Sequence, residues 1–500
     1  MGADTQGSER TMPSGAGPGL AIKPARSHDR SQSFRDRHRR LMRAIPVLVF
    51  VMLCLSESAW FMARLGPLTS PDPDMHGPTI YSLATGRIFS PVHREVDAFG
   101  NPVKRQSLSG DSQFLFLGGK RNILDMDAIQ LSLKGDPGTW QQRLSNNQPR
   151  QQVSIPDRHH ANRSNQYFPL LYLPQAIGLR TAMWSGMTPY SSWQMARITN
   201  VIVFMLLWGT AICMIPRGKW VLAVIGGMPS IVFLASSLMS DGNIIALCGI
   251  FAAIVLKCIE TNRPLARSGR FIVGLLFLLL LYSKILYAVP VLVLLLLPHR
   301  LMTAKVKAGI LLVPMAVFAA TYMPWSMHFG GMLAIGNIAR NTHQMIAHPL
   351  HTAMVILRSM TNLPHMFVHQ PIWFLPQFIV LLAAWLFSLI CVLSRNQSVA
   401  AYRRGPWQWL SENRYFAGML VLCFISIFMM YGALALTWNN LQALNADRLG
   451  GFQVRYIYPL LSLSTFALVS DARCVDNREF MPRLQPSHDR TCYLKGGEAL

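Results

Sequence analysis

Long apolar runs alternate with polar loops along most of the chain, and this pattern predicts a bundle of membrane-spanning helices. Ten runs are interpreted as spans: residues 44–63, 198–215, 221–238, 242–256, 271–283, 285–297, 308–325, 372–393, 416–438 and 456–469. A helix perpendicular to the bilayer needs about 20 residues to cross it, and several of these runs are shorter. The sequence therefore predicts an all-α, polytopic membrane protein with about ten transmembrane helices.

Polar segments divide the chain further. Residues 1–43 are rich in Gly, Ser, Pro and Arg and lack apolar periodicity, which predicts a disordered basic N-terminus. Residues 44–470 form the predicted transmembrane domain, and its first loop, residues 64–196, is too long to be a simple connection. Residues 167–178 near the end of that loop are typical of a short amphipathic helix at the membrane interface. A polar tail, residues 471–500, is predicted to follow in the cytoplasm.

Basic residues gather in the loops that follow every second predicted span. They occur at Arg217 and Lys219 and within residues 257–270, 300–307 and 395–414. The positive-inside rule places these loops, and therefore the N-terminus, in the cytoplasm. This alternation requires residues 271–297 to form two spans that turn at Ser283-Lys284. One long tilted helix would place residues 300–307 outside, so we expect the hairpin.

Several polar segments then share the outer face of the cell membrane. They are the first loop, the tip at residues 240–243, Lys284, and the loops at residues 327–371 and 439–455. Loops that lie on one side of a helical bundle can build one site from several spans. We therefore expect a pocket at this face.

Net charge raises the question of a nucleic-acid partner. The chain carries 46 Lys and Arg against 23 Asp and Glu, a formal net charge of +23. These basic residues lie in loops between apolar runs and form no basic domain interleaved with aromatic residues. Membrane orientation explains the charge, so we predict a lipid bilayer as partner and no nucleic acid.

The sequence lacks the motifs of several common enzyme classes. It contains no Walker loop, no GxGxxG after a strand, no GxSxG and no HExxH, so nucleotide-driven, serine-hydrolase and zinc-protease chemistry are unsupported. Its eight cysteines form no CxxC pair. Six histidines lie in residues 327–371, two pairs of them at helical spacing (His348/His351 and His365/His369). Without a nearby carboxylate cluster, we interpret them as surface residues rather than zinc ligands.

An acidic cluster, Ser70-Pro-Asp-Pro-Asp-Met-His-Gly77, follows the first span. Carboxylates so close to a bilayer face are costly to desolvate and often mark a site. Asp72 and Asp74 have two interpretations: they cap the following helix, or they take a proton from an acceptor hydroxyl or hold a divalent cation. His76 can support either role.

Five further polar residues stand at or near the predicted ends of spans. Asp241 and Asn243 either cap a helix or form the polar wall of a pocket. Lys284 either extends to the interface or pairs with a lipid phosphate. Arg455 opens the last span at its outer end, against the inside bias of basic residues, and its guanidinium suits phosphate contact. Arg197 opens the second span in the same way.

Short motifs in this order resemble a bacterial family of predicted multi-pass membrane proteins of unknown function. They are the acidic motif, a helix with a glycine (Ser82-Leu-Ala-Thr-Gly86), an aromatic-Pro-Leu-x-Tyr-x-Pro segment (Phe168 to Pro174), Arg197, and a late Arg-Tyr-x-x-Pro (Arg455 to Pro459). The resemblance covers most of residues 44–469. That family is similar to the GT-C superfamily of glycosyltransferases.

The resemblance implies a GT-C-like fold and a sugar transfer on the outer face, from a polyprenyl-phosphate donor to a glycan or lipid acceptor of the cell envelope. It assigns the base or metal-ligand role to Asp72, with Asp74 as the second candidate, and makes Mg or Mn a possible cofactor. Family members often have Asp-Glu at the first of these positions, whereas Pro73 follows Asp72 here. Arg455 and Tyr456 match the late motif, and Arg455 is assigned to the lipid phosphate.

The resulting hypothesis is an enzyme with Asp72 and Asp74 as catalytic residues. Its predicted substrate-binding residues are His76, Arg197, Asp241, Asn243, Lys284, Arg455 and Tyr456. Two alternatives remain at this stage: a transporter or flippase for a lipid-linked or anionic substrate, and a non-catalytic subunit of envelope polysaccharide assembly.

Overall fold

The structure is a computed structural model, and it describes residues 27–89, 92–96, 102–108, 121–122, 124–125, 127–135, 158–160, 167–329, 338–368, 374–394, 413–439 and 448–468. The chain divides into two compact units, Met1–Ile45 and Pro46–Leu500. Most of the predicted basic N-terminus and the predicted tail, residues 471–500, lie outside the described residues. The elements described below belong to the second unit, apart from the start of α1 (Ser27–Arg64), which lies in the first.

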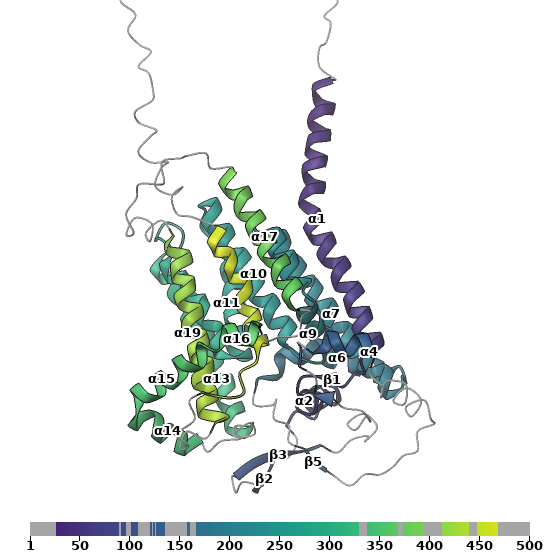
Figure 1. The fold of residues 1–500 in the computed structure, drawn as a ribbon, viewed down its shortest axis with the longest axis vertical. Helices are drawn as coiled ribbons and strands as arrows, with labels where there is room; N and C mark the ends of the chain where they lie inside the picture. The colour runs from purple at the N-terminus through teal and green to yellow at the C-terminus, as the bar shows by residue number, and fades with distance from the viewer. Residues whose placement is uncertain are drawn as a thin grey trace, which may run out of the picture. The chain divides into compact units, whose positions relative to one another are not determined.

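The described chain is mainly helical (Figure 1). Its α-helices are α1 (Ser27–Arg64), α2 (Pro73–Thr85), α4 (Ala128–Lys134), α6 (Leu173–Trp184), α7 (Pro189–Met214), α8 (Lys219–Gly226), α9 (Pro229–Ala235), α10 (Asp241–Thr261), α11 (Arg267–Ser283), α12 (Ile285–Ala288), α13 (Ala304–Phe329), α14 (Ile338–Ala347), α15 (Pro349–Met360), α16 (Leu363–Val368), α17 (Phe374–Ser394), α19 (Arg414–Thr437) and α20 (Tyr458–Leu461). Short 3-10 helices are η2 (Pro169–Tyr172), η3 (Val289–Leu296), η5 (Val454–Tyr456) and η6 (Ser462–Leu468).

Five of the described helices are long and apolar enough to cross a membrane. They comprise Ala44–Arg64 of α1 and the helices α7, α10, α13 and α19. Shorter apolar helical segments occupy Ile285–Leu296, Leu375–Ile390 and Tyr458–Leu468. The protein is thus an all-α, multi-pass membrane protein, whereas the count of ten spans stays a prediction.

One predicted span is interrupted, and the break predicted within a second apolar run is present. The run 221–238 folds as α8 and α9, separated at Gly227 and Met228, because Pro229 opens α9 and lacks the N–H that a continuous helix would use. The run 271–297 is broken at Lys284, whose backbone is extended (φ −154°, ψ 119°).

The chain reverses direction at Lys284. Helices α11 and α13 run parallel, since Gly274 lies beside Pro314 and the Tyr282 hydroxyl lies 2.5 Å from the Thr321 hydroxyl. The segment between them must therefore return, and Leu296 at the end of η3 indeed packs beside Gly418 near the start of α19. The predicted turn at Ser283-Lys284 is present.

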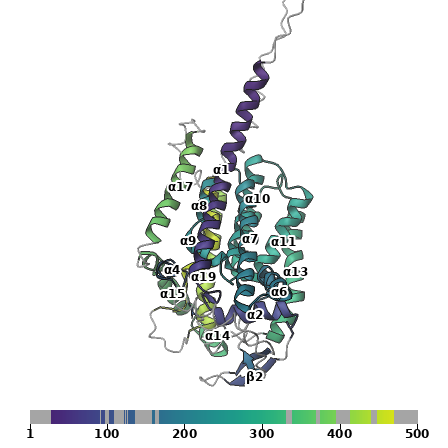
Figure 2. The same ribbon diagram turned by 90° about the vertical axis from the view of Figure 1, so that its right-hand side faces the viewer.

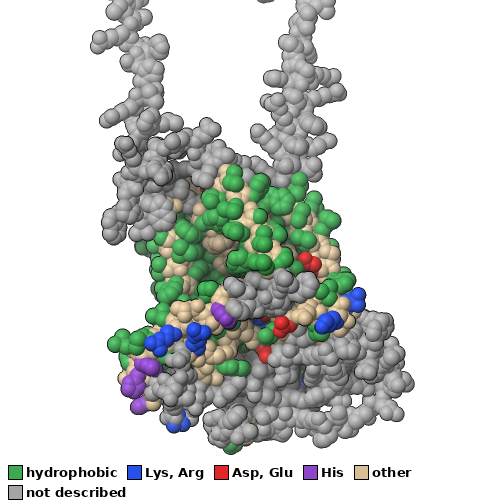
Figure 3. Space-filling view, viewed as in Figure 1, with side chains coloured by type: hydrophobic (Ala, Val, Ile, Leu, Met, Phe, Trp, Pro, Cys, Tyr) green, Lys and Arg blue, Asp and Glu red, His purple; other side chains and the backbone are tan. Residues whose placement is uncertain are grey.

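Upright helices form the main layer of this unit, with the smaller elements at one end. In Figures 1 and 2, α7, α10, α11 and α19 run roughly along the vertical, while α2 and the strands lie near their lower ends. Figure 3 shows hydrophobic side chains over the upper part of the described surface, with charged and histidine side chains mostly below them. Helix α10 lies inside the bundle, since 94% of its most hydrophobic stretch is buried.

The first loop contributes short strands and helices. A three-stranded antiparallel sheet joins β2 (Val92–Val96), β3 (Pro102–Leu108) and β5 (Arg158–His160), and β1 (Thr69–Ser70) pairs in parallel with β4 (Arg121–Asn122). The predicted interfacial helix is η2 followed by α6, which continues to Trp184. Helix α6 packs on α2 and α7, and Tyr172, which immediately precedes α6, is buried.

Candidate functional site

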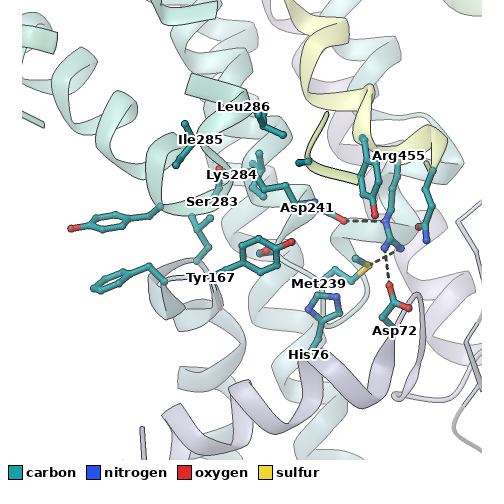
Figure 4. Close-up of a pocket in the computed structure, with 18 of the residues that line it drawn as sticks. Asp72, His76, Tyr167, Met239, Asp241, Ser283, Lys284, Ile285, Leu286 and Arg455 are labelled. Atoms are coloured by element: carbon teal, nitrogen blue, oxygen red, sulfur yellow. Dashed lines mark hydrogen bonds and ion pairs between the residues drawn. The ribbon is translucent and has the colours of Figure 1, made fainter. Parts of the chain in front are cut away.

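A cavity of about 360 Å³ opens where the first loop, α10, the turn after α11 and the segment before α20 come together. Figure 4 shows the polar side chains on its wall. The predicted site residues Asp72, His76, Asp241, Lys284, Arg455 and Tyr456 all line it. Segments from both ends of the sequence thus converge, as expected for loops that share one face.

Arg455 joins two carboxylates of this cavity. Its NH2 group donates to Asp72 Oδ2 at 3.0 Å, and its Nε lies 3.7 Å from Asp241 Oδ2 (Figure 4). The Arg455 side chain is 3% exposed, against 24% for that of Asp72. A guanidinium buried to this degree needs such partners, because an unpaired charge away from water is strongly destabilising.

Asp72 stands at the N-cap position of α2 but its side chain makes no capping hydrogen bond. Pro73 follows as the first helical residue, where the missing N–H of proline is tolerated. The backbone of Asp72 is left-handed (φ 51°, ψ 53°), a conformation that non-glycine residues rarely adopt and that costs about 1–3 kcal/mol. The capping interpretation therefore fails for this side chain, which is turned toward Arg455 instead.

Asp241 is the first residue of α10 and is 6% exposed. Although it forms an ion pair with Arg455, its Oδ2 and the Arg455 Nε have no hydrogen-bond partner among the described atoms. Gln453 Oε1, also at the cavity, is buried without a partner. Asp241 and Arg455 therefore attract each other by charge across 3.7 Å without forming a hydrogen bond.

Lys284 projects its ammonium among three tyrosine rings. Its Nζ lies 4.4 Å from the ring centroid of Tyr456, 5.8 Å from that of Tyr167 and 5.9 Å from that of Tyr287. Within the described part of the chain, the ammonium has no hydrogen bond or ion pair. Burial lowers the pKa of Lys284, but the charge interactions with Asp241, Tyr167 and Tyr456 together outweigh burial, and the pKa is raised. Lys284 is therefore a charged group whose ammonium N–H donors are not used by described residues.

His76 extends from α2 into the same wall. Its Nδ1 lies 2.7 Å from the Tyr172 hydroxyl. Burial lowers the pKa of His76 to about 4, so the ring is neutral at physiological pH. It can orient a ligand or relay a proton as a neutral imidazole.

Arg197 and Asn243, two predicted substrate-binding residues, lie outside the cavity. Arg197 is completely buried and donates to the carbonyls of Ser236 and Leu65. Asn243 Nδ2 donates to Asn200 Oδ1, and Asn200 in turn donates to carbonyls of the turn between α9 and α10. These side chains hydrogen-bond directly or through Asn200 to the turn that precedes Asp241, and the cavity lining does not include them.

Asp125, in the first loop, is a buried carboxyl that sequence analysis missed. It is 2% exposed and accepts a hydrogen bond of 2.8 Å from the Tyr458 hydroxyl. Burial raises the pKa of Asp125 to about 6, and the positive charge of Arg455 opposes this rise. A lone Asp in a weakly patterned loop gives no sequence signal that it lies behind Arg455.

The described residues do not fit a divalent cation. Asp72 and Asp241 are both engaged with the Arg455 guanidinium, and no group of three His, Cys, Asp or Glu side chains is arranged for a metal ion in the described part of the chain. Mg²⁺ requires near-octahedral oxygen ligands, often including carboxylates. The second predicted ligand, Asp74, lies in α2, but its side chain is outside the described residues, as is His369 of the histidine loop.

Comparison with known proteins identifies the family. A family described as a predicted membrane protein (DUF2142) matches residues 45–464. No curated protein and no solved structure matches the chain. The matched region includes every cavity residue named above and leaves only the two ends of the chain outside. The protein therefore belongs to the DUF2142 family of predicted membrane proteins.

Proposed function

We propose that this protein transfers a sugar from a polyprenyl-phosphate donor to a hydroxyl of a cell-envelope glycan or lipid on the outer face of the membrane. The observation that carries the proposal is a carboxylate and a spare cation in one cavity: Asp72, held by Arg455, and Lys284, which no described residue pairs. Group transfer to a hydroxyl needs a proton acceptor at one end and charge compensation at the other.

The lining of the cavity is amphipathic, which suits a lipid-linked donor. Its polar side chains come from α2, the start of α10 and η5, whereas apolar side chains come from α12 and the end of α19. Apolar lining residues include Ile285, Leu286, Ala433 and Leu434, and Ile285 is 48% exposed. An anionic head at Lys284 would thus have an apolar path for its chain beside it.

In the proposed reaction, Asp72 accepts the proton of the acceptor hydroxyl as its oxygen bonds to the anomeric carbon. The bond between that carbon and the phosphate oxygen breaks, and the electron pair leaves with the lipid phosphate. Lys284 compensates this charge, with Arg455 nearby. The sequence favoured Arg455 as the principal phosphate ligand. Because Arg455 already faces two carboxylates, the geometry supports Lys284 in that role instead.

A transporter for an anionic lipid is the second candidate. The break between α11 and α12 at Lys284 favours it, since interrupted helices frequently line the substrate sites of transporters. Such a protein would need Lys284 but no proton acceptor, so the two candidates differ in what they require of Asp72.

Replacement of Asp72 distinguishes them. In a deletion strain complemented with Asp72→Asn, we expect the envelope glycan to be lost and the lipid-linked sugar to accumulate, with turnover reduced about 10²- to 10⁴-fold. Asp127→Asn is the matched control, since Asp127 is an exposed carboxylate of the same loop. Normal glycan decoration by Asp72→Asn would remove the enzymatic proposal and favour transport.

A further inference from the structure

We propose that Arg455 is the built-in cation of this site, taking the place between Asp72 and Asp241 that a divalent metal takes in carboxylate-pair enzymes, so that the protein binds no catalytic metal. The inference rests on the proposed function for its meaning in catalysis. The arrangement of Arg455 between the two carboxylates does not depend on any substrate.

The first step is the position of the guanidinium. Its NH2 group is hydrogen-bonded to Asp72, and its Nε faces Asp241 at 3.7 Å. Figure 4 shows both carboxylates directed at this one group from different segments. A cation placed between the two carboxylates would lie against the guanidinium and be repelled by it.

The second step is that Arg455 is buried and has further neighbours besides the two carboxylates. Its NH1 group lies 3.7 Å from Met239 Sδ, and its Cζ lies 5.6 Å from the Tyr456 ring centroid. The side chain is almost fully buried, and the buried Asp125 stands nearby as a third negative group. Arginine does not lose its proton in proteins, so this positive charge is permanent.

The third step is charge balance. His76 is neutral, and the charged residues that line the cavity are the carboxylates Asp72 and Asp241 and the cations Arg455 and Lys284, while the buried Asp125 interacts electrostatically with Arg455. A divalent ion added to this set would leave an excess of positive charge in a site with little water, which is unfavourable. Arg455 therefore already supplies the neutralisation that a metal would bring.

Manganese binding to the purified full-length protein tests the proposal without any substrate. We expect the paramagnetic resonance signal of free Mn²⁺ to be undiminished by the wild-type protein at submillimolar metal, and thermal unfolding to be unaffected by EDTA. Saturable binding of Mn²⁺ by the wild-type protein, lost in Asp72→Asn, would overturn the proposal.

A variant without the arginine tests the same proposal through an expected gain of metal binding. Arg455→Gln leaves the two carboxylates without their cation, and we expect it to gain Mn²⁺ binding that the double variant Arg455→Gln, Asp241→Asn loses again. Arg448→Gln, which removes an exposed arginine that donates to Asn362, is the matched control. A folded Arg455→Gln protein that binds no Mn²⁺ would contradict the bridging role. If thermal unfolding shows that Arg455→Gln is unfolded, the wild-type titration alone decides.

These outcomes are separate from those of the proposed function. Absence of sugar transfer by the wild-type protein would refute the glycosyltransferase proposal while leaving the metal result intact. Transfer that is abolished by EDTA and restored by Mn²⁺ would retain the proposed function and refute this inference.

Discussion

Arg455 donates to Asp72 across 383 positions of the sequence, so the loop after α1 and the last helical segment meet at one ion pair. The contact is 3.0 Å long, and only one of the two side chains is well shielded from solvent. It fixes the unusual left-handed backbone of Asp72 in a place where the carboxylate reaches the cavity. The pair is thus a geometric link between the proposed proton acceptor and the rest of the site.

Lys284→Met should weaken the binding of a lipid phosphate about 10- to 100-fold, since a hydrogen bond to a charged group contributes about 1.5–3 kcal/mol. Fluorescence quenching by a short-chain prenyl phosphate in detergent would measure the affinity. Lys257→Met serves as control, because Lys257 is an exposed residue near the far end of α10. Equal affinities for both variants would exclude Lys284 from the phosphate site.

His76 predicts a loss of stability in acid. Its pKa is about 4 in the folded protein and about 6.5 when unfolded, so between these values the unfolded state binds a proton that the folded state does not. Stability should therefore fall as pH drops through this window, by about 1–2 kcal/mol at pH near 5. In His76→Gln this decrease in stability with falling pH should disappear, as measured by thermal unfolding at a series of pH values.

Asp125 changes stability with pH in the opposite direction to His76. Comparing wild type with His76→Gln removes this contribution. Its folded pKa of about 6 exceeds the usual value, so its contribution to stability declines as pH rises through the interval up to that value. Wild type and His76→Gln share Asp125, so the difference between them at each pH isolates His76. Identical slopes for the two proteins would contradict the low pKa of the histidine.

Gly451→Ala should destabilise the protein more than Gly86→Ala. Both glycines have positive φ, at 88° and 74°, where an added side chain costs about 1–2 kcal/mol. At Gly451, however, a Cβ atom would lie 2.5 Å from Trp438 Cδ1 on the cavity wall, whereas at Gly86 it would meet nothing within 4 Å. Overpacking adds about 1–3 kcal/mol at the first position only. Equal shifts of the unfolding midpoint would show that Trp438 moves aside freely.

Arg197→Met should lower stability without removing a ligand contact. The variant deprives the carbonyls of Ser236 and Leu65 of their donor, and we expect a loss of about 2–4 kcal/mol. Arg180→Met, which affects a part-buried arginine that donates to the Ala84 carbonyl, should have a smaller effect. Retained stability with a large loss of lipid-phosphate affinity would instead return Arg197 to the binding site.

The sequence predicted the polar residues of the cavity better than the roles of individual side chains. Asp241, Lys284 and Arg455 stand out because each is charged at the end of an apolar run, where desolvation makes charge rare. Arg197 has the same signature, yet its guanidinium points into the bundle and hydrogen-bonds to carbonyls. Sequence position identifies that a buried charge exists, but its partners depend on which way the helix is rotated.

Helix interruptions were predictable only in part. The turn at Lys284 follows from the charge of the next loop, because the positive-inside rule requires an extra crossing. The break between α8 and α9 has a local cause in Pro229, although the uninterrupted hydrophobicity of residues 221–238 indicated a single span. The three tyrosine rings around Lys284 were not predictable, since Tyr167, Tyr287 and Tyr456 come from three distant segments.

The Arg455 contact joins residues that are synthesised at very different times, because the chain is made from its N-terminus. Asp72 and Asp241 precede Arg455 in the sequence, so both are synthesised before the guanidinium that joins them in the folded protein. A chain that stops before residue 448 therefore lacks the cation that links the loop after α1 to the start of α10.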